Sequence, residues 1–440
     1  MFKYLLFFVL FSPLIGIILV ENGAYSISTA QFGHPNGAWL AYTVHCLVLL
    51  AVTFWTIAKK LGSPRKKTTS TSHLPPFVPL AHVILCVNVV FLALMLFGAG
   101  GIEVLMGKME KSGFRASLNY ISAIALWIRS YFVPSLLAYL SFVFTKSLKS
   151  PRERRLFGLN IAICALIGLN WGSKASPLIM LLPSILIIYW KISIRKVILL
   201  ASIACLALIA NSMLFDRSDE GLRWAADEAG DFSLKEAATF VAIRGTVLQG
   251  DVAWYIWDMY EDKQKLPPYF PTLYAAIGDR LFSLFSGIQR SDYPRWVKYH
   301  YDSLLTATAG VPLDEIFVSG HNVNGTIFSE GIIALGSPGY LLFSIFGGLC
   351  AGLSFNIIKE AIDSGRSIRA ALSADYFCLI VFLWLNGGGI TMLFHISVFL
   401  AIMMTYLLIR MCISLSGGSS ETAPAVSVTR GRTPSAQGLA

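Results

Sequence analysis

Runs of about twenty apolar residues recur along almost the whole chain, and they limit its possible folds more than any other feature. Of the 440 residues, 55% are hydrophobic and only 14% are charged. A helix of that length crosses the hydrocarbon core of a bilayer and satisfies its own backbone hydrogen bonds there. The sequence therefore predicts an all-α, polytopic helical membrane protein.

Ten such runs can be delimited, which predicts about ten transmembrane helices. Their approximate ranges are 4–20, 38–58, 77–99, 119–145, 156–170, 175–190, 196–215, 338–358, 371–386 and 390–410. The first run carries one Lys and has no A-x-A-like cleavage site, which favours a retained helix over a signal peptide. Residues 1–215 then hold helices one to seven, and residues 338–413 hold helices eight to ten. Residues 414–440, rich in Ser, Thr, Gly, Pro and Ala, are predicted to be a disordered cytoplasmic tail.

Lysine and arginine concentrate after the second, fourth, sixth and eighth runs, and Lys3 and Arg410 fall on the same side. The clusters are Lys59, Lys60, Arg65, Lys66 and Lys67; Lys146, Lys149, Arg152, Arg154 and Arg155; Lys191, Arg195 and Lys196; and Lys359, Arg366 and Arg369. Because short cytoplasmic loops hold the excess of basic residues, this alternation predicts cytoplasmic termini. The net charge of +10 thus follows membrane topology and does not indicate a nucleic-acid partner.

One long segment, residues 216–320, is predicted to lie on the outer side. It holds 16 of the 25 acidic residues against 10 basic ones, and it is rich in aromatic residues. Long segments of this kind are usually functional or disordered. We predict a folded extracytoplasmic subdomain, residues 216–337, built of lateral amphipathic helices.

The stretch "SGHNVNGTIFSEGIIALGSPGY", residues 319–340, places polar side chains next to an apolar run. On a helix, Asn322, Thr326, Ser329 and Glu330 would share one polar arc with His321 at its edge. This predicts an amphipathic helix along the outer membrane surface, ended by the Gly-Ser-Pro sequence at residues 336–338. A solvated face with a helix cap is the alternative, but a histidine and paired amides are not typical interface anchors.

The segment "RGTVLQGDVAWYIWDMYED" places Arg244, Leu248, Asp251, Tyr255 and Asp258 on one helical face. Arg244 lies among acidic and aromatic residues, which suits a bidentate grip on an anion. An intrahelical surface salt bridge explains the pattern equally well.

Three more basic residues are candidates for substrate binding. Lys174, in "NWGSKASP", either binds a phosphate or snorkels to the interface. Arg290, in the aromatic segment "IQRSDYPRWVKYHYD", can grip a lipid phosphate, although an interfacial anchor has the same composition. Arg129 lies about ten residues inside the fourth run, where a charge needs a partner. His82, Asn386 and His395 are interpreted as satisfied polar groups of the core.

Several signals are absent from the sequence. It contains no Walker loop, no HExxH motif and no DxD pair, so neither a nucleotide nor a divalent metal is implied. The seven cysteines lie in or next to apolar runs without disulfide or zinc spacing, which predicts small core residues. No internal repeat is found, and this weakens the hypothesis of a transporter.

Three segments together resemble the O-antigen polymerases of the Wzy type. They are "GSKASPLIMLLPSILIIYW", "AIRGTVLQGDVAWY" and "NVNGTIFSEGIIALGSPGYLLFSIFGGLCAG", and the resemblance extends from about Leu156 to Cys350. It implies a GT-C-like integral membrane glycosyltransferase of the plasma (inner) membrane, active on its periplasmic face. The donor would be a glycan on undecaprenyl pyrophosphate and the acceptor a lipid-linked repeat unit. Some members carry an arginine followed ten residues later by glycine, a spacing that no loop arginine has here.

The expected reaction is attack of an acceptor hydroxyl on the donor's anomeric carbon, with undecaprenyl pyrophosphate leaving. Without a metal or other cofactor, basic side chains must stabilise the leaving group, so Arg244 is the first candidate, followed by Lys174, Arg290 and Arg129. His321 is the expected general base. Substrate positioning is assigned to Glu330, Asn322, Asn324 and Asp251. The expected partners are the two lipid-linked substrates and the membrane, with a chain-length regulator protein left open.

Three alternatives remain open from the sequence. An O-antigen ligase, or an exopolysaccharide or teichuronic-acid polymerase, would have the same architecture and a different acceptor. A lipid-linked oligosaccharide flippase should line a path with charges in many spans, whereas Arg129 is almost the only charge deep in a predicted span. A structural scaffold would leave the grouping of His321, Arg244 and Lys174 unexplained.

Overall fold

The structure of the protein is a computed structural model. It describes residues 1–23, 25–26, 31–32, 35–62, 74–98, 101–105, 120–169, 176–215, 238, 241–242, 246–261, 288, 292, 294, 325–387, 389–394 and 396–416. These residues form an all-α protein, apart from a short antiparallel pair of strands, β1 (Tyr25–Ser26) and β2 (Gln31–Phe32).

Helices occupy all ten ranges in which the sequence predicts spans. They are α1 (Phe2–Glu21), α2 (Ala38–Ala58), α3 (Phe77–Ala93) with the π-helical turn η1 (Leu94–Gly98), α6 (Tyr120–Lys146), α7 (Pro151–Leu169), α8 (Ser176–Ile188), α9 (Ile194–Phe215), α17 (Ser337–Asp363), α18 (Ser367–Tyr376) continued by η6 (Phe377–Val381) and α19 (Phe382–Leu385), and α21 (Ile396–Leu415). Four further helices are α4 (Gly101–Leu105), α11 (Val247–Glu261), α16 (Ile327–Leu335) and α20 (Thr391–Phe394).

Six helices of the described ranges are long and apolar enough to cross a membrane. They are Phe2–Glu21, Ala38–Ala58, Phe77–Gly98, Ser337–Asp363, Ser367–Leu385 and Val398–Leu415. The prediction of a polytopic helical membrane protein is therefore confirmed. The total of ten spans stays a prediction, because α8 has only 13 residues and α7 begins with the charged sequence Arg-Glu-Arg-Arg.

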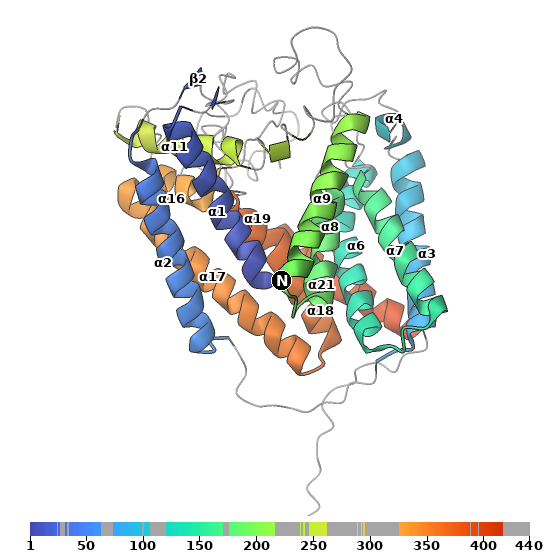
Figure 1. Cartoon of the computed structure of the whole chain (residues 1–440). Coiled ribbons are helices and arrows are strands. Elements are labelled where there is room, and N and C mark those ends of the chain that lie inside the picture. The colour runs from blue at the N-terminus through green and yellow to red at the C-terminus, as the bar shows by residue number, and fades with distance from the viewer. Residues whose placement is uncertain are drawn as a thin grey trace, which may run out of the picture.

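The helices form two groups, with α18 between them (Figure 1). In one group α2 packs along α17, α1 packs against α11 and α2, and α16 packs against α17 and α11. In the other group α6 packs against α8, and α3 packs against α7. The span that begins with α18 joins the groups, because α18 contacts both α6 and α17.

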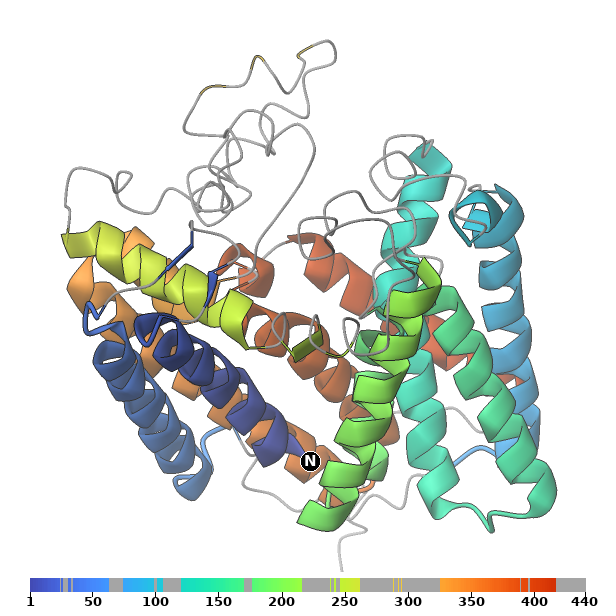
Figure 2. The same ribbon diagram turned by 45° about the horizontal axis from the view of Figure 1, so that its top comes forward.

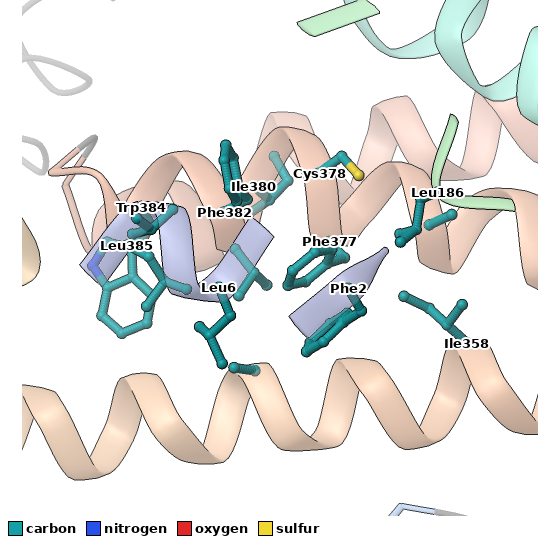
Figure 3. Close-up of a cluster of buried hydrophobic side chains, with 14 of the residues drawn as sticks. Phe2, Leu6, Leu186, Ile358, Phe377, Cys378, Ile380, Phe382, Trp384 and Leu385 are labelled. Atoms are coloured by element: carbon teal, nitrogen blue, oxygen red, sulfur yellow. The ribbon is translucent and has the colours of Figure 1, made fainter. Parts of the chain in front are cut away.

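An aromatic junction fixes the N-terminal end of α1 to this connecting span (Figure 3). The ring of Phe2 stacks on Phe377 of η6 with centroids 4.4 Å apart, and it meets Phe355 of α17 edge-on at 5.1 Å. Trp190 stacks on Phe355 at 5.2 Å and lies 6.4 Å from Phe2, so the three rings contact one another. Such ring pairs stabilise beyond the area they bury, so the start of α1 is part of the core.

All seven cysteines are free, and their burial differs from the prediction of core residues. Cys46, Cys164, Cys378 and Cys412 are buried, whereas Cys86 and Cys205 are exposed. Both exposed residues lie on apolar helices, where an outward-facing thiol is as compatible with a lipid environment as any small apolar side chain.

Helix α11 packs alongside α1 at the end of the bundle where α16 is found (Figure 2). The two backbones touch at Gly16 and Gly250, and a Cβ atom added at either glycine would overlap backbone atoms of the other helix. Small residues permit this close approach. A pair of glycines separated by more than 230 residues thus places a helix of the predicted loop over the membrane helices.

We expect Gly250→Ala to lower the free energy of unfolding by about 1–3 kcal/mol, because the added methyl group has only backbone to displace. The matched control is Gly158→Ala in α7, where a Cβ meets nothing within 4 Å. That change should be neutral or stabilise by up to about 1 kcal/mol, since alanine is the better helix former. Thermal unfolding in detergent measures the stability of both variants. Equal unfolding midpoints would contradict the close backbone contact between α1 and α11.

Candidate functional site

Helix α16 ends at Gly336, as the sequence predicts, but it begins only after Thr326. The predicted helix from His321 onward is therefore wrong at Gly325 and Thr326, which are not helical, so Thr326 does not share a helical arc with Ser329 and Glu330. Gly336 has φ +75°, and the chain reverses there into α17, whose first turn contains Pro338. The position of the helix differs from the prediction of a surface-lying helix. Every residue from Ile327 to Ala334 is buried, including the polar Ser329 and Glu330. The polar arc is therefore not a solvated face, because α11 and α17 pack against this helix.

Both oxygens of the Glu330 carboxyl accept hydrogen bonds from the segment that follows η6. Ile390 donates its backbone N–H to Oε1 at 2.6 Å, and the indole Nε1–H of Trp384 donates to Oε2 at 2.9 Å. Burial raises the pKa of Glu330 to about 7, although these two hydrogen bonds act in the opposite direction. The carboxyl thus fastens α16 to the turn between α19 and α20.

The same turn contacts the start of α16 through its backbone. Gly387 has φ +97°, and a Cβ atom there would overlap the carbonyl group of Gly325. Glycine is the residue that adopts this conformation and permits this approach without strain. Together with the two bonds to Glu330, the contact holds the N-terminal end of α16 in one position, which agrees with the positioning role expected for Glu330.

His45 of α2 faces α17 and has a defined tautomer. The hydroxyl of Ser344 lies 2.5 Å from the carbonyl oxygen of Tyr340, a distance that requires the hydroxyl hydrogen between them. Ser344 must then accept at its oxygen, so Nδ1 of His45, 2.6 Å away, is the donor. The neutral ring therefore carries its lone pair on Nε2, a buried atom with no hydrogen-bond partner among the described residues.

Two aromatic rings, those of Tyr42 and Phe328, contact this histidine, and further rings pack on Phe328. Phe328 of α16 lies 5.1 Å from the ring of Tyr42 and 5.7 Å from that of His45, and Trp257 and Tyr340 pack on it at 6.0 and 5.2 Å. The hydroxyls of Tyr42 and Thr326 approach each other without full hydrogen-bond geometry. Phe328 thus separates half-buried aromatic rings from a buried set of hydroxyl and imidazole groups.

Helix α11 is fastened over this region by its tryptophans. Trp257 donates its indole N–H to the carbonyl oxygen of Asn36 at 2.9 Å, and the Asn36 side chain donates to the Trp254 carbonyl at 3.4 Å. Asp251, on the same helix, is fully buried. The salt-bridge alternative for this helical face stays open, because Arg244 lies outside the described residues.

The structure places two of the predicted site residues, Glu330 and Asp251, and the helices that carry them pack against each other. Arg129 lies on α6, but its side chain is not described. The other predicted residues lie outside the described residues: His321, Arg244, Lys174, Arg290, Asn322 and Asn324. Their roles stay predictions.

Sequence reasoning missed His45 and Tyr42. The available signal was a histidine seven positions after the start of an apolar helix, because polar groups at that depth usually have a specific partner. His82 has a local partner, the Val78 carbonyl oxygen at 2.7 Å, but it is exposed, so its interpretation as a core group is wrong. The Asn386 amide donates to the Phe382 carbonyl oxygen at 3.3 Å. His395 lies outside the described residues.

Within the ranges that the structure describes, no three His, Cys, Asp or Glu side chains come together in a way that could hold a metal ion. Independence from metal stays a prediction. Comparison with protein-family models, characterised proteins and solved structures finds no match for this chain.

We expect Glu330→Gln to lower stability by about 1–3 kcal/mol at pH 5, because an amide NH2 replaces one acceptor and leaves a buried N–H donor unpaired. The pKa of Glu330 is raised from 4.5 to about 7, so its protonated form contributes stability below pH 4.5 that is lost as the pH rises through 7. Between pH 5 and 7 the free energy of unfolding of the wild type should therefore fall toward that of the variant, by at most about 1.4 kcal/mol per pH unit.

Thermal unfolding across this pH range measures the difference between the two proteins. Ser329→Ala, at the adjacent non-ionisable position, is the control and should differ from the wild type by a constant amount. A constant difference for Glu330→Gln as well would show that the carboxyl does not titrate in the folded protein.

Proposed function

We propose that this protein is a polyprenyl-pyrophosphate-dependent glycosyltransferase that joins lipid-linked oligosaccharide repeat units into O-antigen or a related surface polysaccharide. One observation supports the proposal most. Helices α11 and α16, which carry two of the three segments that resemble Wzy-type polymerases, pack against each other although more than 60 residues separate them. The contact joins them at one end of a bundle of membrane helices.

The chemistry of this region suits a reaction between polar sugars on apolar carriers. The reacting groups require hydrogen-bonding side chains near the membrane surface, and the lipid tails require apolar helix faces beside them. Carboxyl, imidazole and hydroxyl groups gather around α16, while α2 and α17 expose Leu40, Leu47, Phe54 and Leu342 on their outer faces. Aromatic rings such as Trp257 and Tyr340 also suit stacking on sugars.

In the proposed reaction, Arg244 stabilises the pyrophosphate that leaves, and His321 removes the proton of the attacking hydroxyl. Glu330 holds α16 in place through its two hydrogen bonds and is not the base, because both of its oxygens already accept N–H donors. The lone pair at Nε2 of His45 is a second acceptor in the same region. The inner membrane is the proposed location, with the site on the periplasmic face.

An O-antigen ligase of the same architecture is the second candidate, because the acceptor is not determined by these residues. The lipopolysaccharide or capsule ladder of a deletion strain separates the two. A band with a single repeat unit supports the polymerase, whereas loss of all polymer from lipid A supports the ligase. An unchanged ladder would contradict both.

We expect Arg244→Ala to abolish long-chain polymer while the protein still accumulates in the membrane. Arg244→Lys, the matched variant, should restore little, because a planar guanidinium binds two pyrophosphate oxygens at once whereas an ammonium acts as a point charge. The ladder of a complemented deletion strain measures chain length. Polymer of wild-type chain length in Arg244→Ala would show that Arg244 forms only a surface salt bridge.

We expect His321→Ala to lower the rate by about two to four decades, which is the usual contribution of a general base. Glu330→Gln should lower it less, because its role is positioning. The assay uses purified protein and synthetic lipid-linked repeats without added metal, and mass spectrometry reads the product. An active His321→Ala beside an inactive Glu330→Gln would transfer the role of base to Glu330.

A further inference from the structure

Asp375 is a second ionisable residue deep in a predicted membrane span, and no step of the proposed reaction uses it. It is the ninth residue of α18 and lies within the span Ser367–Leu385. Of the six apolar spans, this one has the largest buried share. Its side chain is only 3% exposed. Arg129 is therefore not almost the only ionisable residue deep in a predicted span, because Asp375 is buried in another.

The described side chains next to the Asp375 carboxyl are neutral polar groups. Ser135 of α6 lies beside it, and Tyr131 of the same helix and Cys378 of η6 are close enough to interact with it. Its Oδ1 atom is buried without a hydrogen-bond partner among the described residues. A carboxylate at this place would therefore have one buried oxygen that nothing compensates, which is unfavourable inside a membrane.

Among the described side chains, no charged or titratable group of the surrounding helices forms an ion pair with Asp375. On α18 they are Arg369 and Tyr376; on α17, Tyr340, Cys350, Lys359, Glu360 and Asp363; on α21, Tyr406, Arg410 and Cys412; α8 carries none. Glu360 binds Arg366 and Arg369 at 3.3 and 3.2 Å. Arg410 bonds to the Tyr406 hydroxyl at 3.1 Å. The side chain of Arg129, six positions before Ser135 on α6, is not described.

Both helices depart from regular α-helical geometry next to this carboxyl. Pro134 interrupts the hydrogen-bond ladder of α6 immediately before Ser135, because proline has no N–H to donate. The π-helical segment η6 begins at Phe377, two residues after Asp375. Single π-helical turns inside α-helices are frequent at functional sites, and irregular backbone at membrane depth persists where protein buries it.

From this geometry we propose that Asp375, with Ser135, forms a proton-binding site inside the membrane at the contact between α6 and α18. The bound proton makes the carboxyl neutral, and its O–H then has the Ser135 hydroxyl oxygen beside it as an acceptor. Release of the proton leaves a carboxylate between two helices that are already irregular at this point. The site does not depend on the proposed glycosyltransferase reaction.

The same span connects this site to α16. Helices α18, η6 and α19 follow one another without a break from Ser367 to Leu385, and Trp384 near their end donates to Glu330. A change of charge at Asp375 therefore acts on the element that positions the candidate functional site.

The first test is the infrared difference spectrum of the wild-type protein minus Asp375→Asn, near neutral pH. The proposal expects a C=O stretch of a protonated carboxyl that shifts in D2O, and no carboxylate bands. Carboxylate bands in place of the C=O stretch would overturn the proposal. If the carboxylate bands of the wild type were replaced by the C=O stretch in an Arg129→Gln background, the result would assign Asp375 to an ion pair with Arg129.

The second test uses the hydrophobic reagent dicyclohexylcarbodiimide, read by peptide mass spectrometry. A protonated carboxyl gives its proton to a nitrogen of the reagent, and its oxygen adds to the central carbon. Asp375 should react at least about tenfold faster than the ion-paired Glu360 in the same molecule, a ratio that corresponds to one pK unit of protonation. Replacing choline chloride by NaCl in the buffer should leave the rate of Asp375 modification unchanged. Protection by NaCl would overturn the proton site in favour of a sodium site.

Discussion

The contact between α2 and α17 depends on a small set of interhelical hydrogen bonds, and the candidate site depends on that contact. The Thr53 hydroxyl donates to the Gly348 carbonyl at 3.2 Å, and the Asn356 amide donates to the carbonyls of Thr56 and Leu61 at 3.0 and 2.9 Å. Apolar packing gives little preference between helices in lipid, so polar pairs and small residues select the partner and the register. The bond between His45 and Ser344 is the last member of this set, at the end where α16 lies.

Glu330 extends the same principle to the region above the membrane helices. Its carboxyl holds Ile390 and Trp384, while the backbone of Gly387 rests against Gly325. These contacts join three segments that a membrane alone would not hold together: the start of α16, the end of α19 and the turn before α20. A buried acid with two donors therefore gives the short helix α16 a fixed position, and a fixed position is the first requirement for any catalytic group carried on it.

Two buried acids of this protein show how the surroundings determine the use of one functional group. Glu330 is bound by two N–H donors, and its burial still raises its pKa to about 7. Asp375 lies within a membrane span beside a hydroxyl, without an ion pair among the described residues. The first carboxyl is suited to fastening backbone segments, and the second is suited to holding a proton. A sequence shows both only as acids next to apolar runs.

The amino-acid sequence by itself determined the class of the protein and the places of its helices, because apolar length and the need for internal hydrogen bonds leave a membrane-spanning chain few choices. It also located the break at Gly336 and the polar residues of α16, since glycine, proline and helical periodicity are local signals. The tertiary structure alone decided that the polar arc of α16 is buried, that His45 faces Ser344, and that Gly16 meets Gly250. These facts depend on which helices become neighbours, and neighbours distant in the chain are selected by close backbone approach and by single polar pairs, which no local pattern records.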